Sequence, residues 1–398
     1  MKAMIQKQTI HAMGAGWRAA LPRNYWILAC CLLGAALIGL AGVFQSAMAQ
    51  TRGNAQLAQN APLMAYYYIW YDTQSWSRAK NDFPLLGRYS SDDPEIMRQH
   101  IKWAKAAGID GFIVSWKSTH RLDSRLEKLI SIAEQEHFWL WIIYQGLDFD
   151  RNALPIEHIE SDLDLFVRDY ADHTAFGLTD RPVVIWSGTW KYTPEEISLV
   201  TSRFRDRLQI LASERNVAGY ERIANLVEGN AYYWSSVNPQ TNTNYRSKLK
   251  AMAETVHAHG GLWIAPAAPG FDARLVGGTS VVERHYGDTL RQELDAAFGA
   301  SPDAVGLISW NEFSENSHVE PSREYGSTAL DVLAEARNRA ALPMGDFDSS
   351  APAITDMGEY NTLLILGGLL VLVLGSVVIV ARRSNSNTAT SSQRASEL

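Results

Sequence analysis

Residues 304–322 read AVGLISWNEFSENSHVEPS, and the rest of the chain is best interpreted outward from this stretch. Its first residues form an apolar run typical of a buried strand, which ends near Trp310. Glu312, Glu315 and Glu320 follow closely. Carboxylates crowded beside aromatic rings cost free energy unless cations neutralise them or the protein uses them chemically. The stretch therefore predicts either a functional site or the solvated first turn of a helix, where the helix dipole favours acidic residues.

Strand-like and helix-like segments alternate along the chain that leads to this stretch. The strand-like segments are short and apolar, and lie at residues 64–71, 111–116, 138–144, 182–186, 222–227, 262–265, 280–283 and 304–310. Segments with helical spacing lie at residues 94–107, 124–137, 161–172, 194–215, 245–259, 289–298 and 328–341. Such alternation favours a parallel sheet covered by helices. The pattern predicts an α/β fold, a (β/α)8 TIM barrel formed by a single domain over residues 62–343.

In a barrel of this kind the active site lies at the C-terminal ends of the strands. Aromatic, amide and basic side chains recur just after the predicted strands, and flat rings suit stacking against sugars. Taken alone, an aromatic residue is more often a core residue than a sugar platform, so the prediction rests on the recurrence. We interpret the set as a sugar-binding cleft, with the candidates Tyr68, Trp70, Tyr71, Trp116, Tyr144, Tyr233, Trp234, Arg284, Tyr286, Trp310 and Asn311.

The composition limits the class of ligand. The chain has 398 residues and a net charge of −7 at pH 7, whereas nucleic-acid binding needs a basic surface. Neutral sugars are compatible with an acidic protein. Cys30 and Cys31 lie in an apolar N-terminal segment, so the domain has no disulfide and no cysteine metal site. His257 and His259 face different ways on a predicted helix, which argues against a zinc pair, and no cofactor is predicted.

Both ends of the chain carry apolar segments. Residues 25–44 follow several basic residues and precede Ala47-Met48-Ala49, a pattern typical of a signal peptide, with an uncleaved signal anchor as the alternative. Residues 363–381 are uncharged and are followed by Arg382 and Arg383, which predicts a transmembrane helix with a cytoplasmic tail. The sequence thus predicts a domain outside the cytoplasm, tethered to the cell membrane. The predicted order is signal peptide or anchor (1–49), linker (50–61), catalytic domain (62–343), linker (344–362), transmembrane helix (363–381) and tail (382–398).

Several motifs point to one family. In chain order they are YYYIWYD (66–72), AKAAGIDGFIVSW (104–116), DRPVVIW (180–186), APGFDAR (268–274) and ISWNEFSENSHVEPS (308–322). Together they resemble glycoside hydrolase family 99, the endo-α-mannosidase-like family, over most of the predicted domain. The last motif is the most diagnostic, because it carries both glutamates of the family pattern at the family spacing. The resemblance implies a (β/α)8 barrel, a retaining α-mannoside hydrolase and no metal requirement.

The resemblance also implies roles for the two glutamates. By motif position, Glu315 corresponds to the general acid/base that protonates the leaving oxygen and then activates water. Glu312 corresponds to the residue that deprotonates the sugar 2-hydroxyl, which then attacks the anomeric carbon to form an anhydro-sugar. This differs from the ordinary retaining reaction, in which the second carboxylate attacks directly. Tyr233 and Trp234 fall where the family has an aromatic cluster near the reacting sugar.

The stretch departs from the family pattern at Asn316 and Ser317, which stand where the family has Gly-Thr. Among non-glycine residues Asn tolerates left-handed backbone best, so the turn is expected to survive. Glu320 is expected to support the loop by pairing with Arg323. Two alternatives stay open: a barrel that binds glycan without cleaving it, and an accessory protein of surface-polysaccharide assembly. The paired glutamates favour the hydrolase, because a lectin needs no acid/base pair.

Overall fold

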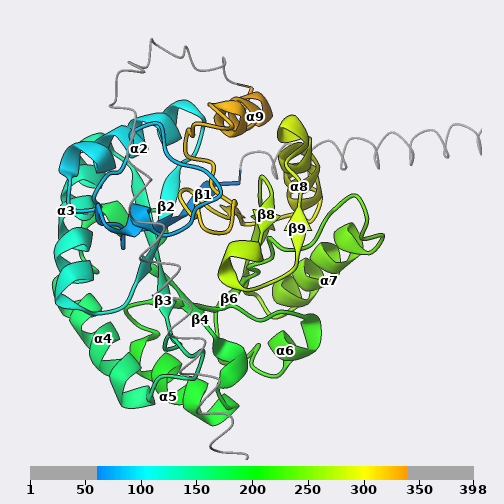
Figure 1. The fold of residues 1–398 in the computed structure, drawn as a ribbon. Coiled ribbons are helices and arrows are strands. Elements are labelled where there is room, and N and C mark those ends of the chain that lie inside the picture. The colour runs from blue at the N-terminus through cyan, green and yellow to red at the C-terminus, as the bar shows by residue number, and fades with distance from the viewer. Residues whose placement is uncertain (1–60, 339–398) are drawn as a thin grey trace, which may run out of the picture. The chain divides into compact units, whose positions relative to one another are not determined.

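Residues 61–338 are described by the computed structural model, and they form a closed parallel barrel with helices outside it (Figure 1). The barrel strands are β1 (Leu63–Tyr68), β2 (Gly111–Trp116), β3 (Trp139–Gln145), β4 (Val183–Ser187), β5 (Gln209–Ala212), β6 (Gly229–Ala231), β7 (Leu262–Ala267) and β10 (Ala304–Leu307). The helices around them are α2 (Pro94–Ala106), α3 (His120–Glu136), α4 (Ile156–Asp169), α5 (Pro194–Phe204), α6 (Val217–Glu221), α7 (Tyr245–Ala258), α8 (Asp288–Phe298) and α9 (Thr328–Ala336). The prediction of a (β/α)8 barrel is confirmed.

The barrel closes between its first and last strands. In β1, Leu63 is paired with Val305 of β10, and Met64 is paired with Gly111 of β2. The order of the other strands follows the chain, and all neighbouring strands of the barrel are parallel. The C-terminal ends of the strands therefore lie at one end of the barrel, and the loops that leave them collect there.

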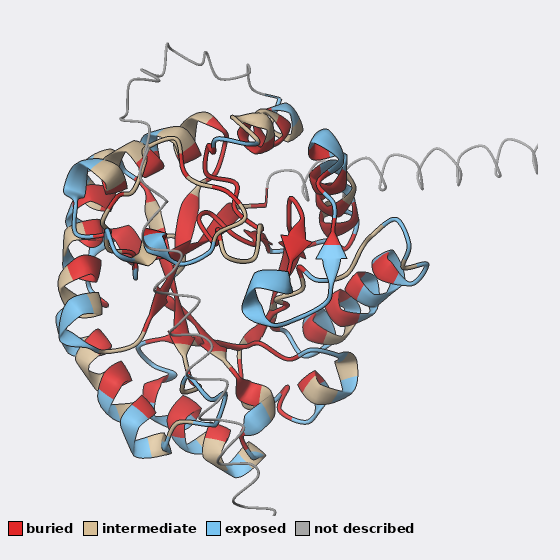
Figure 2. Ribbon diagram, in the orientation of Figure 1, coloured by how far each residue is buried: buried red, intermediate tan, exposed pale blue. Residues whose placement is uncertain are grey.

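Alternate residues of each strand serve two different cores. Met64 and Tyr66 of β1 belong to a cluster made mostly of strand residues, which fills the barrel interior. Leu63, Ala65 and Tyr67 belong to the cluster that includes the inner faces of the surrounding helices. Figure 2 shows the resulting pattern, with buried strands in the centre and helices exposed on their outer sides. Because both faces of each strand are buried, the strands read as continuous apolar runs.

Helix α5 ends earlier than the sequence predicts. It begins with Pro194 and a capping box between Thr193 and Glu196, as its sequence indicates. It ends at Phe204, and the following residues 209–212 form β5, paired with β4. The prediction of a helix over residues 194–215 is therefore wrong in its second half. A short apolar run fits a helix or a strand, and only pairing with β4 selects the strand.

Strand β6 lies outside the segment predicted for it. Residues 222–227, predicted as a strand, contain no regular strand, and β6 follows at Gly229–Ala231. Gly229 has a φ of 150°, and a Cβ at this position would lie 2.2 Å from the carbonyl oxygen of Leu262. Glycine thus allows β6 to approach β7 closely. Because β6 has no large apolar side chain, its sequence carries no strand signal.

The weak strand predicted at residues 280–283 belongs to a hairpin and not to the barrel. There β9 (Val281–Val282) pairs antiparallel with β8 (Phe271–Asp272), outside the closed sheet. This prediction is wrong in placement. The barrel is still complete, because β5, hidden in the helix predicted for residues 194–215, supplies the missing strand.

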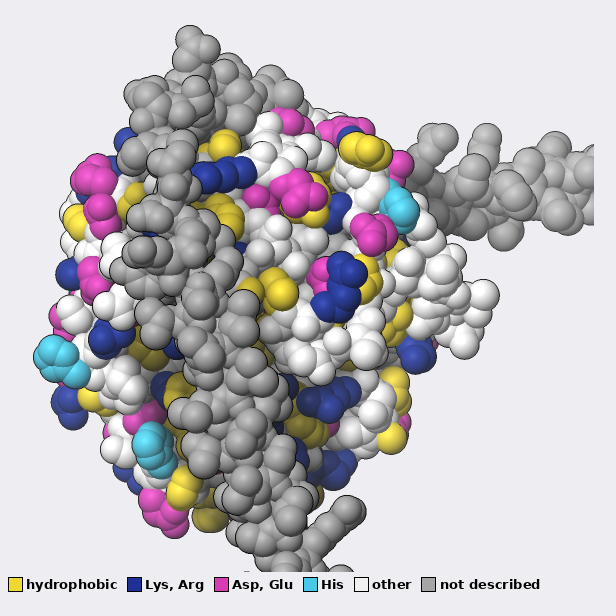
Figure 3. Space-filling view, viewed as in Figure 1, with side chains coloured by type: hydrophobic (Ala, Val, Ile, Leu, Met, Phe, Trp, Pro, Cys, Tyr) yellow, Lys and Arg dark blue, Asp and Glu magenta, His cyan; other side chains and the backbone are white. Residues whose placement is uncertain are grey.

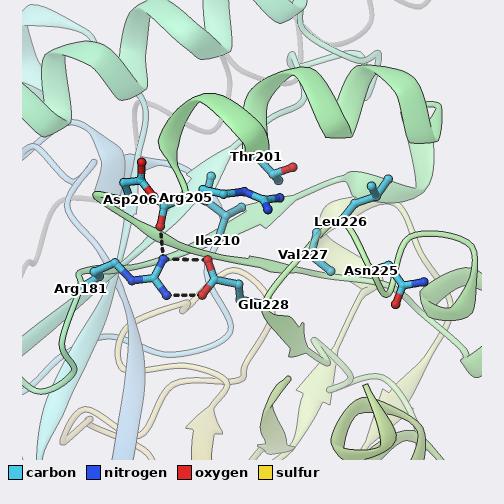
Figure 4. A pocket seen from close by; sticks show the side chains of 9 residues that line it. All are labelled: Arg181, Thr201, Arg205, Asp206, Ile210, Asn225, Leu226, Val227 and Glu228. Atoms are coloured by element: carbon cyan, nitrogen blue, oxygen red, sulfur yellow. Dashed lines mark hydrogen bonds and ion pairs between the residues drawn. The ribbon is translucent and has the colours of Figure 1, made fainter. Parts of the chain in front are cut away.

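A cavity of about 540 Å³ lies near the N-terminal ends of β5 and β6 (Figure 4). Glu228 lines it, directly before β6, and its carboxylate accepts hydrogen bonds from both terminal nitrogens of Arg181. Arg181 also donates to the carbonyl oxygens of Arg205 and Leu208. This ion pair ties together the N-terminal ends of three neighbouring strands. At this end of a barrel such contacts stabilise the fold, whereas chemistry takes place at the other end.

The predicted N-terminal signal segment and the predicted transmembrane helix at residues 363–381 lie outside the described residues. Within residues 61–338, no helix is both long and apolar enough to cross a membrane. Export and membrane tethering therefore stay predictions from the sequence.

Candidate active site

The two glutamates of the opening stretch lie just beyond the C-terminal end of the barrel. The regular strand β10 ends at Leu307, but strand-like hydrogen bonding continues further. The N–H of Trp310 donates to the carbonyl oxygen of Tyr66 at 2.7 Å, so the chain still follows β1 at that point. Glu312 and Glu315 come next, on the turn that leaves the barrel. Their position matches the end of the barrel at which catalytic residues occur.

Glu312 is the more deeply buried carboxyl, with 8% of its surface exposed. Its Oε1 accepts a hydrogen bond from the backbone N–H of Ser314 at 3.1 Å. Burial raises the pKa of Glu312 to about 7, and the charge of Glu315 adds to this increase. The charge of the half-buried Lys80 acts in the opposite direction. Glu312 therefore exchanges a proton near neutral pH, which suits a general base or acid.

Glu315 is half-buried, and the hairpin holds its backbone. The N–H of Asp272 in β8 donates to the carbonyl oxygen of Glu315 at 2.7 Å. Burial raises the pKa of the Glu315 carboxyl, and the nearby charge of Arg151 opposes the increase. The two carboxyls lie three residues apart on one short turn, and the charge of Glu315 contributes to the raised pKa of Glu312.

Two tyrosine hydroxyls lie beside the carboxyl pair. The hydroxyls of Tyr68, at the end of β1, and Tyr233, after β6, are 2.7 Å apart. Burial raises the pKa of both phenols, and the charges of Glu312 and Glu315 raise it further. Both hydroxyls therefore stay protonated and can donate hydrogen bonds. Trp70 stacks on Tyr68 with 4.3 Å between ring centroids and is 43% exposed, as a sugar-stacking platform would be.

Asn311 fixes the turn to β1. Its Oδ1 accepts from the N–H of Tyr68 at 2.9 Å, and its Nδ2 donates to the carbonyl oxygen of Tyr68 at 3.0 Å. The hydroxyl of Tyr71 donates to the carbonyl oxygen of Asn311 at 2.6 Å. Asn311 has no exposed surface, so both of its polar ends are used within the protein. The arrangement sets the position of Glu312 relative to Tyr68.

Arg284 fixes the other side of the turn. Its Nη2 donates to the carbonyl oxygens of Asn316 at 3.0 Å and of His318 at 2.8 Å. Burial lowers the pKa of Arg284 to about 10, so it stays charged at neutral pH. Asn316 has a φ of 51°, the left-handed conformation expected for it, and its Nδ2 donates to the hydroxyl of Tyr325. The turn therefore keeps a conformation that favours glycine although asparagine occupies it.

Comparison with known proteins decides the family. The model for glycosyl hydrolase family 99 matches residues 59–334, which include the barrel strands and the turn with both glutamates. The chain belongs to glycoside hydrolase family 99. The resemblance inferred from the motifs is confirmed, and the protein is a glycoside hydrolase.

Solved structures share the fold of this family 99 protein. The endo-α-mannosidase of the family from Bacteroides thetaiotaomicron, in complex with BIS-TRIS-propane, is 21% identical with a TM-score of 0.61, and the match covers 69% of this chain and 96% of that one. A second structure of the endo-α-mannosidase from that organism is 19% identical with a TM-score of 0.59, and the match covers 69% of this chain and 97% of that one. A glycoside hydrolase-like protein is 17% identical with a TM-score of 0.55, covering 71% and 94%. At these identities the likeness supports the barrel fold. No curated protein matches the chain.

Several predicted sugar-binding residues of this family 99 hydrolase lie elsewhere. Trp116, Tyr144 and Trp310 are buried in the layer between strands and helices. The indole of Trp116 donates to Asp123 and the hydroxyl of Tyr144 donates to Asp162, so their polar groups are used inside the protein. The alternation of strand side chains points them outward from the barrel. At these three positions the side chains are buried, and sugar contact stays a prediction.

The remaining two predicted aromatic residues also stand apart from the carboxyl pair. Trp234 stacks on Tyr245 of α7 with 4.8 Å between ring centroids, and packs against the outer core. Tyr286 is 97% exposed and follows the hairpin. Of the predicted set, Tyr68, Trp70 and Tyr233 lie beside the glutamates, while Tyr71, Asn311 and Arg284 hold the loops that carry them.

Glu320 has a different partner from the one expected. Instead of pairing with Arg323, its Oε1 lies 3.1 Å from Nε2 of His100, and its Oε2 accepts from the hydroxyl of Tyr89 at 2.9 Å. The other ring nitrogen of His100 lies 3.0 Å from the hydroxyl of Tyr67. All four side chains are buried. Residues 89 and 100 are more than 200 positions from Glu320, so nothing in the local sequence indicates these contacts.

Two cations near the carboxyls were not predicted. Lys80 acts electrostatically on Glu312, and the next residue, Asn81, donates from its side chain to the carbonyl oxygen of Ser314 at 3.2 Å. Arg151 acts electrostatically on Glu315. Both lie in loops after barrel strands and belong to no motif. In the described part of the chain, no three His, Cys, Asp or Glu side chains are arranged to hold a metal ion.

Proposed function

We propose that this family 99 protein is a retaining hydrolase of α-mannoside-like glycosidic bonds. The observation that carries the proposal is the pair Glu312 and Glu315, placed on one turn at the C-terminal end of the barrel, with both pKa values raised by burial. Two solved structures of similar fold are described as endo-α-mannosidases, which supports mannose as the sugar. One protonated carboxyl and one ionised carboxyl provide the acid and the base that retaining hydrolysis requires.

In the proposed reaction, Glu315 donates its proton to the glycosidic oxygen as the bond to the anomeric carbon breaks. Glu312 removes the proton of the 2-hydroxyl, and that oxygen forms the new bond to the anomeric carbon, giving an anhydro-sugar. In the second step Glu315 removes a proton from water, whose oxygen attacks the anomeric carbon. The bond between the anomeric carbon and the 2-oxygen breaks, and Glu312 returns the proton to the 2-oxygen. Both carboxyls regain their starting states, and two displacements retain the anomeric configuration.

The surroundings of the pair suit a neutral glycan. One of the hydroxyls of Tyr68 and Tyr233 donates to the other, which leaves one hydroxyl proton for a sugar oxygen, and the exposed ring of Trp70 offers a stacking surface. Figure 3 shows acidic and basic side chains in small separate groups over the visible face, without the continuous basic field that nucleic acid requires. A glycan therefore remains the proposed partner. The distribution of charge argues against binding of nucleic acid.

The kcat/KM of the hydrolase is expected to have a bell-shaped pH dependence that falls above about pH 7. One proton must remain on the carboxyl pair to serve the leaving oxygen, and the pKa of Glu312 is about 7. The last proton therefore leaves the pair near that pH, and the profile reports this macroscopic value. The measurement is kcat/KM across acid and neutral pH. A profile that still rises well above neutral pH would contradict the assignment of the acid to this carboxyl pair.

The test of the proposed function is the release of reducing sugar from a panel of α-mannans and related glycans, with the anomeric form of the first product followed by proton NMR. We expect cleavage of α-linked mannose with the α-anomer formed first. An initial β-anomer would overturn the retaining mechanism. Glycan binding by the wild type without any cleavage would favour the glycan-binding barrel instead.

We further propose that the catalytic domain works outside the cytoplasm and is tethered to the cell membrane. This rests on the signal-like residues 25–44 and the uncharged residues 363–381, which are followed by Arg382 and Arg383. The full chain is expected in the membrane fraction after alkaline extraction, and a chain ending at residue 343 is expected to be released. Recovery of the full chain in the soluble fraction would contradict the tether.

A further inference from the structure

A buried histidine lies at the base of the turn that carries the two glutamates, and the proposed reaction does not use it. His318 has no exposed surface, and its ring stacks on that of Phe313 with 4.0 Å between ring centroids. The turn closes on itself here, because the N–H of Ser309 donates to the carbonyl oxygen of Ser317 at 2.7 Å. The N–H of Val319 donates back to the carbonyl oxygen of Ser309 at 2.8 Å. The backbone on both sides of His318 is therefore fixed.

Both ring nitrogens of His318 face charged groups. Its Nδ1 lies 3.2 Å from Nη2 of Arg284, and its Nε2 lies 3.5 Å from Oδ2 of Asp82, with no hydrogen-bond partner nearer than this among residues 61–338. Arg284 can only donate, so Nδ1 accepts and the ring proton belongs on Nε2, facing the carboxylate. Burial and the charge of Arg284 together lower the pKa of His318 to about 3, although Asp82 acts against them. The ring is therefore neutral near pH 7.

Asp82 is held in place by the long loop between β1 and α2. Its Oδ1 accepts from the N–H of Phe83 at 2.7 Å, and the N–H of Glu324 donates to both of its oxygens, at 3.1 and 3.2 Å. Burial acts to raise the pKa of Asp82, but its hydrogen bonds outweigh burial and lower the pKa. Asp82 is therefore an ionised group with a fixed direction, and its Oδ2 faces His318.

Arg284 connects this ring to the backbone of the turn. Besides Nδ1, its Nη2 contacts the carbonyl oxygens of Asn316 at 3.0 Å and of His318 at 2.8 Å. Asn316 has a φ of 51°, a conformation that costs a non-glycine residue free energy and persists only where its surroundings hold it. The contact from Arg284 to its carbonyl oxygen holds it in this way, and that contact depends on the direction of the guanidinium.

We infer that His318 is a positioning residue for the turn that carries Glu312 and Glu315. Its Nδ1 directs the guanidinium of Arg284 toward the carbonyl oxygens of the turn. Asp82 keeps the ring proton on Nε2, which leaves Nδ1 able to accept. The inference rests on the proposed function, because the turn that His318 fixes carries the two carboxyls of that reaction.

The test compares two variants of the full-length protein with the wild type on an α-linked mannose oligosaccharide, at a temperature where each is folded. His318→Phe keeps the ring that stacks on Phe313 and removes both nitrogens. His318→Asn gives up the ring and keeps an acceptor, its Oδ1, near the position of Nδ1. We expect His318→Phe to lower kcat about 10-fold and His318→Asn to keep most of it. KM should change little, because Tyr68 and Trp70 lie outside this network. His259→Phe, on the exposed end of α7, is the control and should equal the wild type.

Asp82→Asn tests the tautomer of the ring. The oxygen of the new amide keeps the hydrogen bond from Phe83, so its NH₂ group faces Nε2 and drives the ring proton to Nδ1, opposite Arg284. We expect a loss of kcat similar to that of His318→Phe, and no further loss when the two changes are combined. Nitrogen NMR of histidine-labelled protein should show His318 as the Nε2–H tautomer in the wild type and as Nδ1–H in Asp82→Asn. The signal is assigned by its absence in His318→Phe.

A kcat of His318→Phe equal to that of the wild type would overturn the inference. A loss in His318→Asn as large as in His318→Phe would also overturn it, because the packing of the ring and not its acceptor would then matter. If the wild type cleaves no glycan, the proposed function fails and the NMR measurement decides alone. The Nε2–H tautomer in the wild type, changed in Asp82→Asn, would support the arrangement of Asp82, His318 and Arg284, and any other result would overturn it.

Discussion

Glu315→Gln is expected to lower kcat for α-mannoside hydrolysis by about 10²- to 10⁴-fold, the usual contribution of general acid–base catalysis. Glutamine keeps the size of the side chain but can neither protonate the leaving oxygen nor take a proton from water. The backbone contact from Asp272 involves the carbonyl oxygen of Glu315 and is unaffected by the change. The measurement is the initial rate of reducing-sugar release by wild type and variant at the pH optimum.

Glu221→Gln is the matched control, because Glu221 is exposed at the end of helix α6, on the outside of the barrel. Its activity is expected to equal that of the wild type. Activated glycosides with nitrophenol as the leaving group need little proton donation. With these substrates, Glu315→Gln should therefore slow the first step much less than it does with natural glycans. A variant that retains more than about a tenth of wild-type activity on natural glycans would remove Glu315 from the acid role.

The variant Glu312→Gln distinguishes a catalytic role of Glu312 from a role in stabilising the fold. Burial raises the pKa of Glu312 to about 7, so the folded protein holds this proton more tightly than the unfolded chain does. The resulting contribution to stability is fully present below the unfolded pKa and is lost as the pH rises through about 7. Glu312→Gln is therefore expected to be inactive and yet to unfold at a higher temperature than the wild type above neutral pH. An inactive variant that is also less stable there would point to loss of structure.

The second large effect is expected from Glu320→Ala, which should reduce the free energy of unfolding by about 3 kcal/mol. The change leaves His100 and Tyr89 buried without the carboxylate that both contact. It also weakens the support of Asn311, whose Nδ2 lies 3.3 Å from the hydroxyl of Tyr89. The measurement is urea unfolding followed by tryptophan fluorescence. Glu324→Ala removes an exposed carboxyl from the same loop and is expected to cost much less.

A loss as small as that of Glu324→Ala would show that the buried network around Glu320 contributes little stability. The activity of Glu320→Ala, measured where the protein is folded, should also fall, because Asn311 positions the turn with Glu312 relative to Tyr68. Glu320 acts here as a positioning residue. Its loss should lower kcat and leave the pH at which activity falls nearly unchanged.

Most of the fold could be predicted from the sequence, because the strands of a barrel are buried on both faces and read as apolar runs. The misses have separate physical causes. Strand β5 is short and apolar, so its sequence also fits an extension of helix α5, and only its pairing with β4 identifies it as a strand. Strand β6 contains Gly229 and other small residues, so it had no apolar signal, and the weak segment near Val281 forms a hairpin instead of a barrel strand.

The position of the candidate site was predictable, and its composition only in part. An aromatic residue after a strand can point into the barrel or out toward the helices, and the sequence does not show which. Tyr68 lies beside the carboxyls, whereas Trp116 and Tyr144 point into the outer layer. The positions of Lys80 and Arg151 near the carboxyls could not be predicted, because basic residues in loops follow no periodic pattern and belong to no motif.

The sequence by itself determined the barrel class, the family and the two glutamates, because apolar periodicity and the spacing of a motif are properties of the local chain. Only the tertiary structure decided what surrounds those glutamates. Burial raises the pKa of Glu312, Arg284 donates to carbonyl oxygens of the turn, and Glu320 pairs with His100 instead of Arg323. Each of these depends on contacts between residues far apart in the chain, and the free energy of such contacts is set by packing and burial.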